Sequence, residues 1–534
     1  MRKIIALFAC VLVMMSMGQV QAQNKKEKVN YDAKDLVNGR RGSVRYQKLI
    51  GDVVFSFKKR NAQIYADSAY YYRRKGEMEC YGKVRIVEND SINITSRKLV
   101  YRTTERMAKL REDVVYSDGN MTLYTDFLDY NTTSKSAHYF NSGKIIDGEN
   151  TLTSTQGTYY PNQKKMVFSG EVKLVNPEYT LETDSLIYNT VTKEATTFGY
   201  TKSTRSDGST LDTPHGMIYD ASSQESQVYS GVIETDAYRV KGDDMVYNKA
   251  ENLYKVIGNV YMLSKKDSVE ITGQEAYYDK SRGYTKIWGS PVMKKIMEVD
   301  TFYLSADTLI AVDNKQENEN KMLAFHDVKI WKSDLQGIAD SMAYNMNDSL
   351  IYLYDDPLLW AQRNQIEADS ISLKLGKGSL DKMFLQRNAF IIMEDTVGNF
   401  NQIKGREMVA HFKGKSIEEV DVNGNSESLY FALKQDNSLQ GLNRILCSNM
   451  KIFFEGTQPS EVRFYVKPEA TFYPPHEITD ELKVLKGLNW RKSDRPTLED
   501  VLAPRGVQPA DSTGVISTPA PILKEAIDAP ALNE

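Results

Sequence analysis

A tyrosine preceded two residues earlier by an apolar side chain recurs along this chain at a nearly constant spacing, and this repeat constrains the fold more than any other feature. The intervals between successive copies are 30, 29, 29, 29, 31, 28 and 31 residues. The copies end at Tyr71, Tyr101, Tyr130, Tyr159 (with Gly157 in the apolar slot), Tyr188, Tyr219, Tyr247 and Tyr278, and looser copies end at Ala311, Tyr344, Leu373 and Ala410. A period of roughly 20 to 50 residues is typical of an array of stacked units. The repeat, rather than the total length, therefore predicts the domain organisation.

Each repeat has a second half in which a turn residue precedes alternating apolar and polar side chains, as in "YGKVRIV" at 81–87. Alternation with a period of two predicts strands with one buried face. The apolar pairs are Val84/Ile86, Val172/Leu174, Val260/Met262 and Val328/Ile330 in this half, and Leu128/Tyr130, Leu186/Tyr188 and Met245/Tyr247 in the half that ends at the tyrosine. Two strands of roughly six to eight residues and two turns fill one period. We therefore predict an all-β fold, a long, narrow, twisted double sheet of about twelve two-strand repeats.

These pairs predict a continuous apolar stripe inside the double sheet. The stripe either fills the interior as a dry core or lines an open groove. A groove would suit acyl chains, because each buried methylene contributes about 0.8 kcal/mol and ten acyl carbons contribute on the order of 8 kcal/mol. Such binding needs no single indispensable residue. The lipid-binding hypothesis therefore concerns the stripe as a whole, while any one residue in it is explained more simply as core.

Cations gather in the turns that follow the tyrosines. They are Arg73, Arg74, Lys75, Lys164, Lys165 and Lys193, with further members at Lys135, Lys249, Lys280 and Arg282. Because the repeats stack, we expect these turns to line one rim, where a basic ladder would meet phosphates or anionic sugars. The alternative is that the turns are charged simply because they are solvated, and nearby acidic residues weaken the ladder. The formal net charge of -3 gives no field that favours nucleic acid.

The first residues have the pattern of a secretory signal peptide. Arg2 and Lys3 precede an apolar run from Ile4 to Gly18, and a small residue, Ala22, occupies the expected cleavage position. The run is shorter than the roughly 20 residues of a spanning helix. We therefore predict cleavage after residue 22, export, and a linker over residues 23–45. Two cysteines then remain, Cys80 and Cys447, which we interpret as core residues because they lie in distant repeats.

The repeat region is predicted to span residues 46–476, as one array or as two or more fused modules. After residue 476 the periodicity ends, and proline, alanine, aspartate and serine dominate. Residues 477–534 are therefore predicted to be a proline-rich, mostly disordered extension, with a short helix near its start.

No catalytic or metal-binding motif emerges, so we expect neither an enzyme nor a cofactor. The five histidines are scattered, and no H-E-x-x-H, P-loop or G-x-S-x-G pattern is present. Asp-Ser or Asp-Thr pairs recur once per period, which indicates a structural role, and we place them where strands begin. Two alternatives remain open, a structural or adhesive exported array and a β-helix enzyme acting on polysaccharide, although no local acidic cluster supports the enzyme.

The ends of an open stack present unpaired strand edges, which a partner can use for strand addition. The predicted terminal edges are residues 53–57 and 462–466. Alternatively, the flanking segments cap them.

The motif around Ala66, Asp67 and Ser68, followed by Gly82 and Val84, resembles the LptA/OstA-like family of lipopolysaccharide transport proteins, also called organic solvent tolerance-like N-terminal domains. Further copies of its elements are Thr183-Asp184-Ser185 with Gly170 and Val172, and Gly258 with Val260, and the resemblance covers roughly residues 50 to 430. It implies a β-jellyroll of stacked, V-shaped strand pairs whose groove holds lipopolysaccharide acyl chains. It also implies a periplasmic location near the outer membrane, other Lpt-type proteins as edge-strand partners, and head-to-tail self-association.

Overall fold

The computed structural model describes residues 29–504, except residues 90, 299, 315–317, 377–378, 415 and 456–457. The predicted signal peptide and residues 505–534 of the predicted extension lie outside the described residues. The chain divides into two compact units, residues 1–206 and residues 207–534, and each is described separately.

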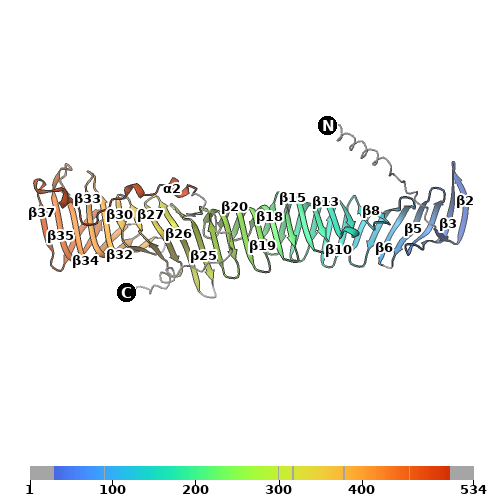
Figure 1. Cartoon of the computed structure of the whole chain (residues 1–534), viewed down its shortest axis with the longest axis horizontal. Coiled ribbons are helices and arrows are strands. Elements are labelled where there is room, and N and C mark those ends of the chain that lie inside the picture. Colours follow the sequence, from blue (N-terminus) through green and yellow to red (C-terminus); the bar gives the residue numbers. More distant parts are fainter. Residues whose placement is uncertain are drawn as a thin grey trace, which may run out of the picture. The chain divides into compact units, whose positions relative to one another are not determined.

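Unit 1 is built of antiparallel strands that follow one another along the chain (Figure 1). Its elements are β1 (Asn30–Asp32), β2 (Asp35–Arg41), β3 (Val44–Phe57), β4 (Ala62–Tyr72), β5 (Glu77–Glu88), β6 (Ile92–Arg102), β7 (Met107–Ser117), β8 (Thr122–Asn131), β9 (Ala137–Tyr139), β10 (Gly143–Asp147), β11 (Asn150–Ser154), β12 (Gln156–Tyr160), the 3-10 helix η1 (Pro161–Gln163), β13 (Lys165–Val175), β14 (Tyr179–Asn189) and β15 (Glu194–Arg205).

Unit 2 continues the same pattern of antiparallel strands and ends in short helices. Its strands are β16 (Thr210–Thr213), β17 (Met217–Asp220), β18 (Glu225–Glu234), β19 (Tyr238–Asn248), β20 (Leu253–Ser264), β21 (Val269–Asp279), β22 (Tyr284–Trp288), β23 (Val292–Ile296), β24 (Thr301–Ser305), β25 (Thr308–Asn314), β26 (Glu319–Lys332), β27 (Leu335–Asn345), β28 (Leu350–Tyr354), β29 (Leu358–Ala361), β30 (Asn364–Glu367), β31 (Ser370–Leu375), β32 (Leu380–Glu394), β33 (Phe400–Lys413), β34 (Ser416–Leu433), β35 (Leu439–Glu455), β36 (Gln458–Tyr465) and β37 (Glu469–Tyr473). The helices are η2 (Pro475–Glu477), η3 (Asp480–Lys483), η4 (Lys492–Asp494) and α2 (Leu498–Leu502). The all-β prediction and the β-jellyroll are confirmed. None of the helices among the described residues is long and apolar enough to cross a membrane.

The predicted strands of six to eight residues are too short, because each long strand crosses a bend. β4, β5 and β6 have 11, 12 and 11 residues, and the pairing register of β5 with β6 shifts between Tyr81 and Val84. The shift breaks the apolar alternation, so one bent strand looks like two strands in the sequence. One repeat therefore supplies two bent strands. We call the half next to the repeat tyrosine the tyrosine arm and the half with the Gly-x-Val pattern the valine arm.

The recurring aspartate and glycine form the bend itself. Gly82 of β5 has φ +92°, and an oxygen of the Asp67 carboxylate on β4 accepts a hydrogen bond from the Lys83 backbone N–H at 3.0 Å. A Cβ atom on Gly82 would lie 2.2 Å from that carboxylate, so only glycine fits beside it. Gly199 and Asp184 repeat the arrangement, with a Cβ distance that would also be 2.2 Å. The pairs at 67–68, 184–185 and 340–341 therefore lie in the middle of strands, where their predicted position at strand entry is wrong, whereas those at 307–308 and 369–370 lie at the start of β25 and β31, as predicted.

The N-terminal edge of unit 1 also differs from the prediction. β2 pairs with the first part of β3, and β1 pairs with its last part, Asn30 opposite Ser56 and Asp32 opposite Val54. Residues 30–32 and 35–41 are thus strands rather than linker, and residues 54–56 pair with β1 rather than forming an edge. At the other predicted edge, β36 pairs with β35 and Val462 is 38% exposed.

Residues 475–504 of unit 2, which we call the strap, pack against the sheet. The prediction of a mostly disordered extension is therefore wrong for the part of it that the structure describes. Leu485 of the strap is buried against an apolar cluster of the sheet composed of Phe390, Ile392, Leu429, Phe431 and Leu442. α2 contacts β24 and β26, far earlier in the sequence (Figure 1). The strap therefore runs back along strands that precede it.

Two buried glutamines bind the strap backbone in the same way. The Gln402 amide donates to the Lys483 carbonyl at 2.8 Å and accepts from the Leu485 N–H at 2.7 Å. The Gln365 amide donates to the Asn489 carbonyl at 2.7 Å and accepts from the Arg491 N–H at 2.8 Å. Each glutamine thus satisfies a backbone donor and a backbone acceptor two residues apart, as a neighbouring strand would.

Candidate functional site

The predicted stripe is fully buried in the first part of unit 1. Val84 and Ile86 on the valine arm are 1% and 3% exposed, and Leu128 and Tyr130 on the tyrosine arm are 0% exposed. All four belong to one apolar cluster, so the two arms face each other and share a core. We call residues 44–147 the closed segment.

Polar and aromatic contacts join the tips of the two arms in the closed segment. The Arg60 guanidinium donates to the Tyr101 hydroxyl at 2.8 Å, and the Phe57 and Tyr101 rings meet edge to face with centroids 5.4 Å apart. The Glu88 carboxylate, which is 1% exposed, accepts from the Tyr130 hydroxyl at 2.9 Å and forms an ion pair with Lys135. Burial, reinforced by the Glu88 charge, raises the pKa of Tyr130. We call these contacts the cross-arm lock.

Towards the end of unit 1 the same stripe becomes less buried. Val172 and Leu186, next to the bend, are 1% and 3% exposed. Leu174 and Tyr188, nearer the tips, are only partly buried. Leu174 packs at the margin of the cluster, whereas the neighbouring Lys173 is exposed and forms an ion pair with Glu182 at 2.8 Å.

Unit 2 begins with a segment in which the outer rows of the stripe are half-buried throughout. Met245 and Val260, beside the bend, are 4% and 2% exposed, but Tyr247 and Met262 are only partly buried. The partly buried rows are Tyr219, Tyr247, Tyr254 and Tyr278 on the tyrosine arm and Leu211, Ile233, Val240, Met262 and Ile271 on the valine arm. We call residues 210–288 the half-exposed segment.

The tyrosine row of this segment forms a stacked ladder. The rings of Tyr247 and Tyr254 lie 4.2 Å apart with 19° between their planes, and Tyr254 lies 5.8 Å from Tyr278. Burial raises the pKa of Tyr278, although the side chain is not fully enclosed. One arm thus presents flat aromatic faces and the other presents flexible aliphatic side chains, a lining that suits an apolar ligand.

Glycines on the valine arm allow close packing at the base of this segment. A Cβ atom on Gly242 would lie 2.1 Å from a methyl of Val256, and one on Gly273 would lie 2.7 Å from a methyl of Ile287. The arms therefore meet tightly at the bend, while their outer rows are left half-buried.

The last two members of the stripe lie in a closed part of unit 2. Val328 and Ile330 are 0% and 4% exposed and belong to a large apolar cluster that includes Leu304, Leu353 and Leu385. The structure therefore divides the predicted stripe into closed and half-exposed parts, a division that apolar patterning alone does not contain.

The turns after the tyrosines line up in unit 1. The backbone N–H of Thr103 donates to the Gly76 carbonyl at 2.8 Å, and that of Thr190 donates to the Lys164 carbonyl at 2.8 Å, so each turn contacts the next. Arg73, Arg74, Lys75, Lys164 and Lys193 are exposed and Lys165 is partly buried. The positions predicted for the basic rim thus share one line of turns.

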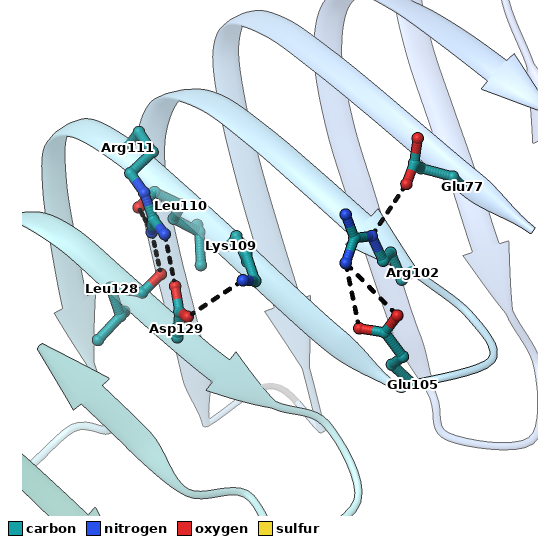
Figure 2. Close-up of polar contacts among 8 residues, drawn as sticks. All are labelled: Glu77, Arg102, Glu105, Lys109, Leu110, Arg111, Leu128 and Asp129. Carbon is teal, nitrogen blue, oxygen red and sulfur yellow. Dashed lines mark hydrogen bonds and ion pairs between the residues drawn. The ribbon is translucent and has the colours of Figure 1, made fainter.

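Acidic residues alternate with cations along this line and on the adjoining strands (Figure 2). Arg102 donates to Glu77 at 2.9 Å and contacts Glu105 at 3.4 Å, and the hydrogen bond to Glu77 contributes most to raising the pKa of its guanidinium. Arg111 donates to Asp129 at 2.8 Å, and Lys109 lies 3.8 Å from the same carboxylate. Arg102, Lys109 and Arg111 are therefore paired within the protein.

A cluster that sequence analysis missed lies on β33 and β34. His411, Glu419 and Asp421 each place a possible ligand atom within 4.8 Å of the others. The ammonium of Lys451 lies 3.0 Å from Glu419 and 3.1 Å from Asp421, which raises its pKa and balances their charge. The feature that brings these side chains together is the hairpin of β33 and β34, which places His411 opposite Glu419. With Lys451 in place, the cluster is explained as an ion-pair network.

The two described cysteines are buried free thiols, consistent with core residues. Complete burial raises the pKa of Cys80 to about 12.

Two family models match the chain. The model described as OstA-like protein matches residues 26–184, and the model described as LptA/(LptD N-terminal domain) LPS transport protein matches residues 151–284. Together they cover residues 26–284, just under half of the chain. No curated protein matches the chain.

Solved structures also match. LptH, the LptA-homologous periplasmic component of the lipopolysaccharide transport device of Pseudomonas aeruginosa, is 14% identical, with 20% of this chain and 81% of LptH covered and a TM-score of 0.19. The extracellular domain of BT4673 from B. thetaiotaomicron is 9% identical, with 83% of this chain and 99% of that chain covered and a TM-score of 0.09. TM-scores this low support no argument about the site. The resemblance to the family therefore depends on the family models and on the bent-strand repeat. Over residues 26–284, this chain resembles the LptA/OstA-like family of lipopolysaccharide transport proteins.

Proposed function

We propose that this protein is a non-enzymatic, lipopolysaccharide-binding transport or bridge protein that carries acyl chains against the half-exposed segment. The observation that carries the proposal is the incomplete burial of the outer stripe in residues 210–288, where Tyr247 and Met262 stay partly accessible. The family assignment supports lipopolysaccharide as the ligand class. No single residue is essential in this account.

The physical basis is the burial of apolar surface. Each acyl methylene buried between the arms contributes about 0.8 kcal/mol, so a chain of ten carbons contributes on the order of 8 kcal/mol before the cost of ordering it. Methionine and stacked tyrosines adapt to a flexible ligand better than a rigid aliphatic wall does. The turn cations are mostly exposed to solvent and its ions, so they would add only weak, screened contacts to phosphates.

The location and partners follow from the family. We propose that the protein is exported to the periplasm, associates with the outer membrane, and meets other Lpt-type proteins through its edge strands. β2 at the N-terminal edge has exposed apolar residues at Leu36 and Val37, and β36 at the other end has Val462 and Tyr465 exposed. The same edges would permit head-to-tail self-association by strand addition.

A photoreactive residue placed at Met262 tests the proposal in cells. Tyr261 is the matched control, because it is the adjacent residue on the opposite face of β20, where Lys241 lies over its ring at 5.5 Å. We expect lipopolysaccharide adducts at position 262 at least tenfold more abundant than at position 261. A second pair, Leu174 and Lys173, makes the same comparison in unit 1.

Adducts absent from Met262 and Leu174, or equal at inward and outward positions, would contradict the proposal. The alternative of a structural or adhesive array, in which the stripe only fills a core, would then be favoured.

A further inference from the structure

A cavity of about 300 Å³ lies in unit 2 where three segments far apart in the sequence meet. The turn between β29 and β30 contributes Gln362 and Arg363, and the turn between β32 and β33 contributes Asp395, Thr396 and Gly398. The strap closes the third side with Trp490, Lys492 and Arg495. The cavity exists only because the strap docks on the sheet.

Most charges that line this cavity are satisfied by the protein. The Asp395 carboxylate accepts hydrogen bonds from the backbone N–H groups of Val397 and Asn399, at 2.9 and 2.8 Å. Lys492 lies 3.1 Å from Glu394. Glu394 is therefore charge-paired, and Asp395 keeps its charge but is stabilised by hydrogen bonds, so three cations and two carboxylates line the cavity.

Arg363 has the least satisfied guanidinium of the cavity. Among the described residues, its guanidinium donates a long hydrogen bond of 3.4 Å to the Asp395 carbonyl. The Arg363 side chain is exposed. Arg495, by contrast, donates to the side-chain oxygen of Gln336 and to the Gln362 carbonyl, each at 2.8 Å. Arg363 thus retains donors in the fork geometry that binds a carboxylate or phosphate.

Two tryptophans complete the lining. Trp360 is 1% exposed, and within the described part of the chain its indole N–H has no hydrogen-bond partner. That nitrogen has almost no accessible surface, so Trp360 forms part of the cavity wall and offers no donor to a ligand. Trp490 packs against Phe400 with ring centroids 5.0 Å apart and presents an aromatic surface to the cavity.

We propose that this cavity binds one anionic sugar unit, a sugar ring that carries a carboxylate or a phosphate. Arg363 would bind the anion and Trp490 would contact the ring. Because polar groups and aromatic rings line the cavity together, a sugar fits it better than an acyl chain does. The cavity volume is at the lower end of the range for small-molecule sites. The inference is independent of acyl-chain binding in the half-exposed segment.

Ligand-observed saturation-transfer NMR on the full chain tests this proposal with glucuronic acid, glucose 6-phosphate, glucose and inorganic phosphate. We expect saturable binding of at least one anionic sugar, at least tenfold tighter than glucose and inorganic phosphate. The two anionic sugars distinguish a carboxylate ligand from a phosphate ligand.

Two variants locate the binding. Arg363→Ala should weaken it at least tenfold, and Thr396→Trp should block the cavity from an exposed loop without removing charge. Arg387→Ala is the matched control, an arginine that is 74% exposed and pairs with Asp369 away from the cavity. Far-UV circular dichroism establishes that each variant is folded.

The proposal is overturned if neither anionic sugar binds, if inorganic phosphate binds as tightly as the sugars, or if both cavity variants bind like the wild type.

Discussion

The closed and half-exposed segments share one strand pattern but differ at the tips of their arms. Ile86 and Met262 hold the same position in the repeat, yet Ile86 is 3% exposed and Met262 is partly buried. Two residues further on, the closed segment has Glu88, which bonds across to Tyr130. The half-exposed segment has Ser264 there, which bonds to Asp267 in its own turn at 2.8 Å.

This difference identifies one contact that accompanies closure. The inward residues are apolar in both segments, so hydrophobicity alone does not distinguish them. Glu88 joins the tips of its own pair of arms, whereas Asp118, at the equivalent position of the next repeat, caps its own turn while Tyr116 stays 1% exposed. The cross-arm contact therefore accompanies closure at one repeat and is not required at every repeat.

The largest predicted contrast comes from deleting equivalent tyrosines. Tyr130→Ala should destabilise the closed segment by about 3–5 kcal/mol, because it empties a fully buried site. Tyr247→Ala should cost about 1 kcal/mol in the half-exposed segment, where the ring is already partly solvated. Hydrogen exchange of β7 and β8, compared with β19 and β20, measures both effects. Equal losses would contradict the difference in closure.

Removing the charge of the cross-arm lock should have the next largest effect. Glu88→Gln leaves the Lys135 ammonium without its partner, and we expect a loss of about 2 kcal/mol. Glu182→Gln is the control, since its ion pair with Lys173 is exposed and should cost less than about 0.5 kcal/mol. Denaturant unfolding of both variants measures the comparison, and similar midpoints would mean that the lock does not stabilise closure.

Adding a methyl group at the base of the half-exposed segment tests the close approach of its arms. Gly242→Ala should cost about 1–2 kcal/mol, because the new Cβ would overlap a methyl of Val256. Combined with Val256→Ala, the loss should be about 1 kcal/mol smaller than the sum of the single losses. Strict additivity in a double-mutant cycle would show that the arms are not in contact there.

Alkaline pH should weaken the closed segment through Cys80. The folded-state pKa of about 12 lies above 9.0, the ordinary value of a cysteine thiol, so above pH 9 the unfolded thiol loses its proton while the buried thiol keeps it. Stability is complete below pH 9 and falls as the pH rises towards 12, by about 1 kcal/mol between pH 9 and pH 10. The free energy of unfolding of Cys80→Ala, measured at pH 9 and at pH 10, should not show this part of the loss. If the variant lost as much stability between the two pH values as the wild type does, complete burial of Cys80 would be contradicted.

Local patterns were sufficient to predict the all-β repeat, because alternation and period are properties of neighbouring residues. The bend was not predictable in the same way. Gly82 needs its positive φ because Asp67, on the adjacent strand, occupies the space of its side chain. Only the pairing of β4 with β5 brings the two together.

The lock and the strap were missed because their partners are remote in the sequence. Glu88 and Lys135 are 47 residues apart, and Gln402 and Leu485 are 83 residues apart. From the sequence alone, a glutamate at a strand end or a glutamine within a strand cannot be told from a surface residue, because its partners are known only once the strands are paired. The proline content after residue 496 likewise indicated a loose extension, although it does not reveal that Leu485 has a buried site on the sheet.

Thiol accessibility compares the two segments most directly. In a chain with Cys10, Cys80 and Cys447 replaced by alanine, Ile86→Cys and Met262→Cys are reacted separately with an N-alkylmaleimide, with and without lipopolysaccharide. We predict that the thiol at position 262 reacts at least 100-fold faster than the thiol at position 86, and that lipopolysaccharide slows only the former. Equal rates at the two positions, or a rate at position 262 that lipopolysaccharide does not change, would contradict the account.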